Sequence, residues 1–200
     1  MKRNLSRAAI MLLLSIGLIH SIALPSVAAD TEQKQYLLLK LGGYFPQSDE
    51  MKDYNDGFNG EIYYGRYFHK NFSSELGAGY FKSTTSESTL GFVDVKVFDI
   101  IYNLKGVYRI GRLELFAGPG VGLYFAKGYY PSITTTTEWK PAFGYHVLAG
   151  CSFDVSTEWF LGLEGKYFWA TTQDPIIPQG GVFGTHLGGL VGTATLGWRF

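Results

Sequence analysis

The pattern that most constrains this chain is an alternation of apolar residues with polar or small residues at every second position. In the segment "TATLGWRF" (residues 193–200), alanine, leucine, tryptophan and phenylalanine share one face, and threonine, glycine and arginine share the other. A period of two is the signature of a β-strand whose two faces meet different surroundings. No sustained helical period and no apolar stretch of membrane-spanning length occurs in residues 30–200. The chain is therefore predicted to be all β.

The same alternation recurs along the chain and predicts eight strands, at residues 36–45, 59–68, 72–82, 93–109, 113–126, 140–154, 159–169 and 186–200. Three connections are tight turns, "HKN" (69–71), "IGR" (110–112) and "VSTE" (155–158). Between them lie four long polar or glycine-rich loops, at residues 46–58, 83–92, 127–139 and 170–185. Short turns on one rim and long loops on the other are typical of outer-membrane barrels. The predicted fold is an eight-stranded antiparallel up-and-down transmembrane β-barrel.

Parity within the strands separates charged residues from bulky apolar ones. In "FLGLEGKYFW" (160–169), Glu164 and Lys166 share a face with glycine, opposite leucine, tyrosine and tryptophan. An outward charged face would give a lipocalin-like carrier with an apolar interior, whereas an inward charged face leaves an apolar belt for lipid. Near-equal numbers of both signs favour the inward arrangement, because buried charges need partners. The predicted interior network comprises Lys40, Glu61, Glu75, Asp99, Lys105, Glu114, His146, Glu164, Lys166 and Arg199.

Large aromatic residues stand at or near the predicted strand ends. Such positions are typical of the aromatic girdles that mark the two membrane interfaces. The predicted girdle comprises Trp139, Trp159, Trp169, Trp198 and Phe200.

The N-terminus predicts export. A basic start, an apolar run and the small-residue site "VAA" are typical of a signal peptide, here residues 1–29, which leaves one barrel domain at residues 30–200. The formal net charge of zero gives no indication of a nucleic-acid partner. The single cysteine, Cys151, cannot form a disulfide within the chain and is expected on the lipid-facing side.

Several segments, including "KLGGYFP", "ELGAGYF", "FAGPGVGLYFAK", "FLGLEGKY" and "LGWRF", resemble the small outer-membrane β-barrels of Gram-negative bacteria, of the OmpX and OmpA transmembrane-domain type. The resemblance implies location in the outer membrane and contact with its lipid and lipopolysaccharide. It also implies insertion by the barrel assembly machinery, which in this family reads a C-terminal strand ending in an aromatic residue. Phe200 would then be part of the insertion signal, and the protein would be a monomer.

No catalytic residues, metal ligands or cofactor are predicted. His146 is expected inside the barrel, but Leu148 stands where a lipid A deacylase-like His-any-Ser pair would need a hydroxyl, and no base and nucleophile are adjacent in the sequence. The expected function is non-enzymatic: a structural, adhesive or partner-binding role through the four long loops. The alternatives are a lipid-modifying enzyme, a narrow channel for hydrophobic solutes and a soluble lipocalin-like carrier. Within the interior, Glu164 is expected to pair with Lys166, Lys105 or Arg199.

Overall fold

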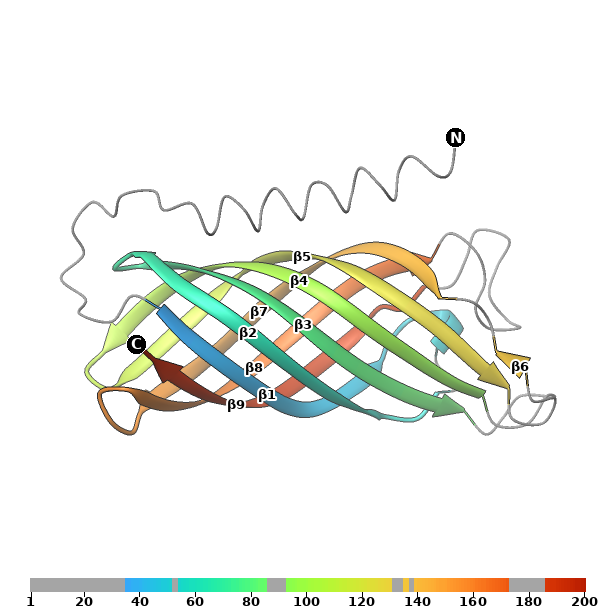
Figure 1. The fold of residues 1–200 in the computed structure, drawn as a ribbon, viewed down its shortest axis with the longest axis horizontal. Coiled ribbons are helices and arrows are strands. Elements are labelled where there is room, and N and C mark those ends of the chain that lie inside the picture. The colour runs from blue at the N-terminus through green and yellow to red at the C-terminus, as the bar shows by residue number, and fades with distance from the viewer. Residues whose placement is uncertain (1–34, 52–53, 86–92, 131–134, 137–138, 173–185) are drawn as a thin grey trace.

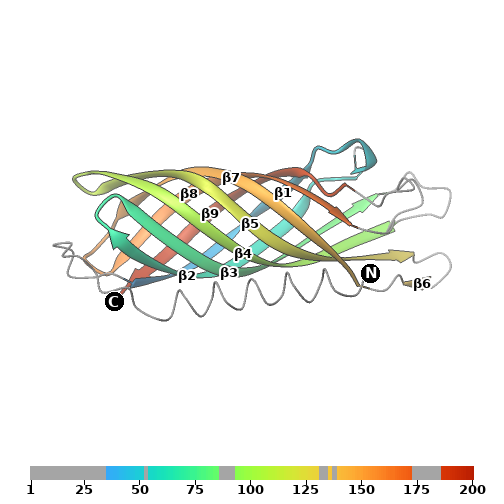
Figure 2. The ribbon, with the colours of Figure 1, turned by 90° about the horizontal axis from the view of Figure 1, so that it is seen from above.

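The computed structural model describes residues 35–51, 54–85, 93–130, 135–136, 139–172 and 186–200, and the predicted signal peptide lies outside them. The described residues form eight long strands around one barrel (Figures 1 and 2). These are β1 (Gln35–Pro46), β2 (Gly57–His69), β3 (Phe72–Thr85), β4 (Val93–Ile110), β5 (Leu113–Tyr130), β7 (Lys140–Asp154), β8 (Trp159–Thr172) and β9 (Gly189–Arg199). A 3-10 helix η1 (Asp49–Met51) and a short strand β6 (Thr135–Thr136) complete the described elements. No helix among them is long and apolar enough to cross a membrane.

Every long strand pairs antiparallel with its neighbours in the chain, and β1 pairs with β9 to close the barrel. The closing register runs from Tyr36 opposite Arg199 to Pro46 opposite Gly189. β6 lies outside this cycle and pairs only with the end of β5. The predicted fold class, an eight-stranded antiparallel up-and-down barrel, is confirmed.

The two rims of the barrel differ as the loop lengths predicted. β2–β3, β4–β5 and β7–β8 are joined by short turns at one rim, where β1 begins and β9 ends (Figure 1). Gly111 in the β4–β5 turn has a φ of 59°, a left-handed conformation that glycine adopts without steric cost. At the other rim three strands continue beyond the predicted ends, to Thr85, Tyr130 and Thr172. The predicted loops were too long there because pairing of β4 with β5 persists to Asp94 opposite Tyr129.

The faces of the strands are inverted relative to a soluble barrel. In β1 the outward side chains Leu37, Leu39 and Leu41 are 39%, 47% and 49% exposed, while the inward Lys40 is fully buried. Burial of a lysine beside exposed leucines is unfavourable in water and favourable when the outer surroundings are lipid.

The interior also holds two apolar clusters, one toward each rim. Toward the long-connection rim, Tyr44, Phe81, Tyr124 and Phe168 pack together, and Met51 of η1 folds in to join them. Toward the short-turn rim, a second cluster includes tyrosines, aliphatic residues and a phenylalanine: Tyr36, Leu38, Tyr63, Tyr67, Ile101, Val107 and Phe160. The prediction of an interior filled by ion pairs was therefore incomplete, because aromatic side chains fill much of both ends.

Candidate functional site: the charged interior and the rims

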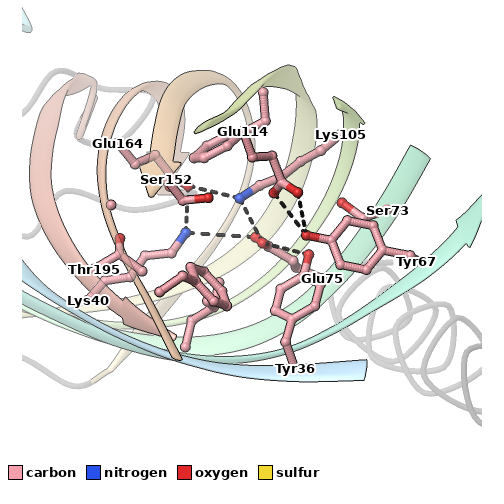
Figure 3. A pocket seen from close by; sticks show the side chains of 14 residues that line it. Tyr36, Lys40, Tyr67, Ser73, Glu75, Lys105, Glu114, Ser152, Glu164 and Thr195 are labelled. Atoms are coloured by element: carbon pink, nitrogen blue, oxygen red, sulfur yellow. Dashed lines mark hydrogen bonds and ion pairs between the residues drawn. The ribbon is translucent and has the colours of Figure 1, made fainter. Parts of the chain in front are cut away.

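Two lysines and two glutamates, each from a different strand, meet near the middle of the barrel (Figure 3). Lys40 Nζ lies 2.7 Å from a Glu164 oxygen and 3.7 Å from Glu75, and Lys105 Nζ lies 2.7 Å from Glu75 and 3.0 Å from Glu164. All four are almost completely buried. We call this set the charge quartet. Each ion has two partners of opposite sign, which is the arrangement that offsets the desolvation of buried charges.

Aromatic and amide groups complete the surroundings of the quartet. Tyr36 donates its hydroxyl hydrogen to Glu75 at 3.1 Å, and Asn103 donates to the other oxygen of the same carboxylate at 3.0 Å. The ammonium of Lys40 lies 4.2 Å from the ring centre of Tyr63, and that of Lys105 lies 4.1 Å from the ring centre of Phe116. Cation–π contacts of this kind strengthen when they are shielded from water.

A second ion pair lies on the long-connection side of the quartet. Lys166 Nζ contacts Glu61 at 2.5 Å, and Asn59 and Tyr63 donate hydrogen bonds to the same carboxylate. A third cluster surrounds Glu114 near the short-turn rim.

In that third cluster, Arg109 and Tyr67 contact the Glu114 carboxylate at 2.7 and 2.8 Å. Arg199 lies 3.9 Å from Glu114 and 2.6 Å from Asp154. The guanidinium of Arg199 also lies 4.2 Å from the ring centre of Phe160. Through these contacts Arg199, the last residue of β9, links the end of that strand to the barrel interior.

Three members of the predicted network are only partly satisfied. One is Arg199, whose Nε and Nη2 atoms have no hydrogen-bond partner among the described residues. His146 Nε2 lies 2.7 Å from Asn103 Oδ1, but its Nδ1 atom has no hydrogen-bond partner among the described residues. Asp99 is buried, and its Oδ1 atom likewise has no partner in the described part of the chain. Among the described residues, the hydrogen-bond partner of the His146 ring is therefore an amide and not a hydroxyl.

The structure buries all ten residues that the sequence assigned to the interior. The expected partners of Glu164 were only partly right. Lys105 is a partner, but Lys166 and Arg199 pair elsewhere, with Glu61 and with Asp154 and Glu114. The main partner is Lys40, which lies far away in sequence and is brought close by the closure of the barrel.

Little open space remains at the level of the quartet. The cavity bounded by Tyr36, Lys40, Glu75, Lys105, Glu164 and their neighbours has a volume of about 20 Å³. That is room for about one water molecule. The charged layer therefore closes the barrel at this depth.

The predicted girdle residues lie at both rims, with exposed fractions between 37% and 48%. Trp159 and Trp198 are opposite each other near the short-turn rim, and the Trp198 ring is 4.9 Å from that of Phe200. At the other rim Trp169 stacks on Tyr145 at 5.2 Å. Trp159 and Trp169 of β8 lie ten residues apart, which is about 33 Å along the strand and about 24 Å along the barrel axis at a 45° tilt.

An apolar band of that height, between aromatic rings and around a charged interior, is the surface of a membrane barrel. The chain matches the family model described as outer membrane protein beta-barrel domain over residues 12–200. It belongs to that family. Membership places it among the proteins of the outer membrane and excludes the soluble lipocalin-like alternative.

Solved structures of outer-membrane proteins share this fold. Neisserial surface protein A is 17% identical, with a TM-score of 0.56 over 82% of this chain and 95% of that one. OprG from Pseudomonas aeruginosa is 14% identical, with a TM-score of 0.61 over 84% of this chain and 96% of that one. No curated protein matches the sequence.

Sequence reasoning missed the hydroxyl and amide donors of the interior, Tyr36, Asn59, Tyr63, Tyr67 and Asn103. All five stand at inward-facing positions of their strands, as do the carboxylates that they contact. The alternation of the sequence therefore indicated that these side chains point into the barrel. These side chains carry no charge, so the balance of acidic and basic residues in the sequence does not single them out.

One imidazole–hydroxyl pair was also missed. On the outer side of the long-connection rim, His186 Nδ1 lies 2.7 Å from Thr171 Oγ1. An isolated antiparallel β-bridge pairs Thr171 with His186 across the β8–β9 connection. No local sequence motif indicates this pairing. No group of three or more histidine, cysteine, aspartate or glutamate side chains in the described ranges is arranged to hold a metal ion.

Proposed function

We propose that this outer-membrane barrel is a sealed, non-enzymatic membrane anchor that presents a projecting β-sheet to partners outside the cell. The closed charge quartet is the observation that carries the sealed-anchor part of the proposal. Above it, the aromatic cluster of Tyr44, Phe81, Tyr124 and Phe168 and the inserted Met51 add a second obstruction. A solute would have to break buried ion pairs and displace packed rings to pass.

The projecting sheet supports the interactive part of the proposal. β4 and β5 each have 18 residues, well beyond the roughly 9–11 that cross a bilayer. They extend past the other strands at the long-connection end, together with β3 and the short β6 (Figure 1). Exposed strand edges above a membrane suit recognition by strand addition.

The sealed interior predicts the absence of conductance. Wild-type protein reconstituted into planar lipid bilayers should give no discrete current steps at applied voltage, because the quartet leaves no continuous water path. Insertion is checked independently by the mobility shift of the unheated protein on detergent electrophoresis. Regular single-channel openings from correctly inserted protein would contradict the sealed-anchor proposal.

The projecting sheet predicts a separable surface function. Replacing residues 128–138 with Asn-Gly should leave the barrel intact, because Lys127 and Trp139 flank the paired residues Ala126 and Lys140 and a two-residue turn can join such strands. We expect adhesion of cells carrying this variant to fall several-fold.

The matched control removes residues 174–184 from the β8–β9 connection and leaves β5 and β6 in place. Its adhesion should stay near the wild-type level. Equal adhesion by wild type and both variants, at equal surface abundance, would show that the projecting sheet is not the interactive surface.

A second candidate function, a narrow channel for hydrophobic solutes, is favoured by one observation. The interior toward the long-connection rim is lined by apolar and aromatic side chains, and Met51 of η1 is fully buried among them. Uptake of an apolar solute that depends on the wild-type protein, and that rises when Met51 is replaced by alanine, would favour the channel over the sealed anchor.

A further inference from the structure

Three lysines from neighbouring strands stand side by side on the outer surface near the long-connection rim. Lys82 of β3 is directly opposite Lys96 of β4, and Lys96 is directly opposite Lys127 of β5. Each is an outward residue, since the residues before and after it in its strand point into the barrel. We call Lys82, Lys96 and Lys127 the lysine row.

The lysine row is unfavourable unless an anion faces it. Directly opposite residues of antiparallel strands have Cβ atoms about 4.5–5.5 Å apart, and like charges at that spacing destabilise a sheet. One carboxylate compensates in part: Asp94 lies 2.9 Å from Lys82 and accepts a hydrogen bond from Thr84. Within the described part of the chain, Asp94 is thus the acidic residue paired with a row of three positive charges.

The other two lysines contact aromatic rings. Lys96 Nζ lies 6.0 Å from the ring centre of Tyr129, and Lys127 Nζ lies 5.6 Å from that of Trp139. These contacts orient the ammonium groups without neutralising them. Their charge remains available to a ligand.

The depth of the lysine row indicates the ligand. Tyr80, Phe98 and Phe125 form the next outward row toward the membrane centre, and they too are directly opposite one another. Two residues advance about 6.7 Å along a strand, or about 5 Å along the membrane normal at a 45° tilt. Outward aromatic residues of this kind sit at the interface. The ammonium groups therefore lie at the level of lipid phosphates.

On the described strands, the outward-facing lysines gather on this side of the barrel. The remaining outward-facing basic residue on the described strands, Arg66, lies near the opposite rim, across from Gln35. In the half toward the long connections, the outward lysines of the described strands are all in the row. A general snorkelling of lysines around the rim would not give this one-sided placement.

We propose that the lysine row binds the phosphorylated head group of a lipid in the outer leaflet, an inference that rests on the proposed placement of the long-connection rim at the cell surface. The lysines contact the phosphates, and the aromatic row beneath them contacts the start of the acyl chains. A membrane lipid fits better than a soluble polyanion, because the cationic surface continues directly into an apolar one.

The test uses bisphosphorylated lipid A titrated into the purified full-length barrel in a maltoside detergent, which carries no competing phosphate. Native mass spectrometry counts bound lipid for wild type, for Lys96→Gln/Lys127→Gln, and for the control Lys70→Gln/Arg112→Gln, which removes the same charge from the opposite rim. We expect about 30-fold weaker binding for the first variant, from about 1 kcal/mol per lysine. The control should bind like wild type, and dephosphorylated lipid A should bind wild type weakly.

Three outcomes would overturn the proposal. Equal affinity of wild type and the lysine-row variant would show that the row does not bind phosphate. Displacement of the lipid by low millimolar inorganic phosphate would indicate a free-anion site. Tighter, lysine-dependent binding of dextran sulfate than of lipid A would assign the row to a soluble polyanion. None of these results bears on conductance, so the sealed-anchor proposal is tested separately.

Discussion

Glu164→Leu should lower the free energy of unfolding by about 3–5 kcal/mol, because it leaves buried lysines without a carboxylate. The loss of ion pairing is greatest for Lys40, which loses its partner at 2.7 Å and keeps Glu75 at 3.7 Å. Lys105 keeps Glu75 at 2.7 Å. The change is measured by urea unfolding of the protein in lipid vesicles, followed by tryptophan fluorescence.

Removing Lys40, the lysine that loses its close partner in Glu164→Leu, provides the decisive comparison. Lys40→Met/Glu164→Leu deletes one charge of each sign and leaves the Lys105–Glu75 pair in place, so most of the lost stability should return. Glu158→Leu, in the exposed β7–β8 turn, controls for loss of a glutamate and should change stability by less than about 0.5 kcal/mol. If the double variant were as unstable as Glu164→Leu, the loss would come from packing and not from the uncompensated charge.

The inward placement of Lys40, Glu75, Lys105 and Glu164 follows from the sequence because strand geometry has a period of two. Any strand that alternates glutamate or lysine with leucine must place them on opposite faces. The excess of apolar residues on the other face and the alternating loop lengths then decide which face is inside. Fold class and face assignment can therefore be predicted from the amino-acid sequence alone.

The pairing of these side chains cannot be predicted in the same way. Lys40 and Glu164 lie on β1 and β8, which are not neighbours, so their contact depends on the stagger of the closed barrel. Met51 poses a different problem, because it enters the interior from a connection that has no strand alternation. Long-range closure and irregular segments are where local patterns lose their predictive value.

The same limit applies to the lysine row. Lys82, Lys96 and Lys127 each look like isolated surface lysines in the sequence, because nothing local relates their positions. Only the register of β3, β4 and β5 shows that they are adjacent. A one-residue slip of β4 would turn Lys96 into the barrel, so the row exists only in this register.

Gly77→Ala should destabilise the barrel by about 1–3 kcal/mol, because the interior has no room for one added methyl group. Gly77 is directly opposite Tyr63, and a Cβ at Gly77 would lie 2.2 Å from a ring carbon of Tyr63. The ring cannot move freely, since its hydroxyl donates to Glu61 at 2.8 Å and its face contacts Lys40. Unfolding by urea in vesicles again provides the measurement.

Gly165→Ala is the matched control, since Gly165 is also a strand glycine but faces outward. The nearest atom to its added Cβ would be the Ala149 carbonyl oxygen at 4.0 Å, an ordinary contact. Its effect should therefore stay within about 0.5 kcal/mol. A double-mutant cycle then identifies the cause: if the Tyr63 ring is the obstacle, Gly77→Ala should cost much less in a Tyr63→Ala background than in wild type. An equal cost in both backgrounds would show that the backbone at Gly77, and not the aromatic ring, requires glycine.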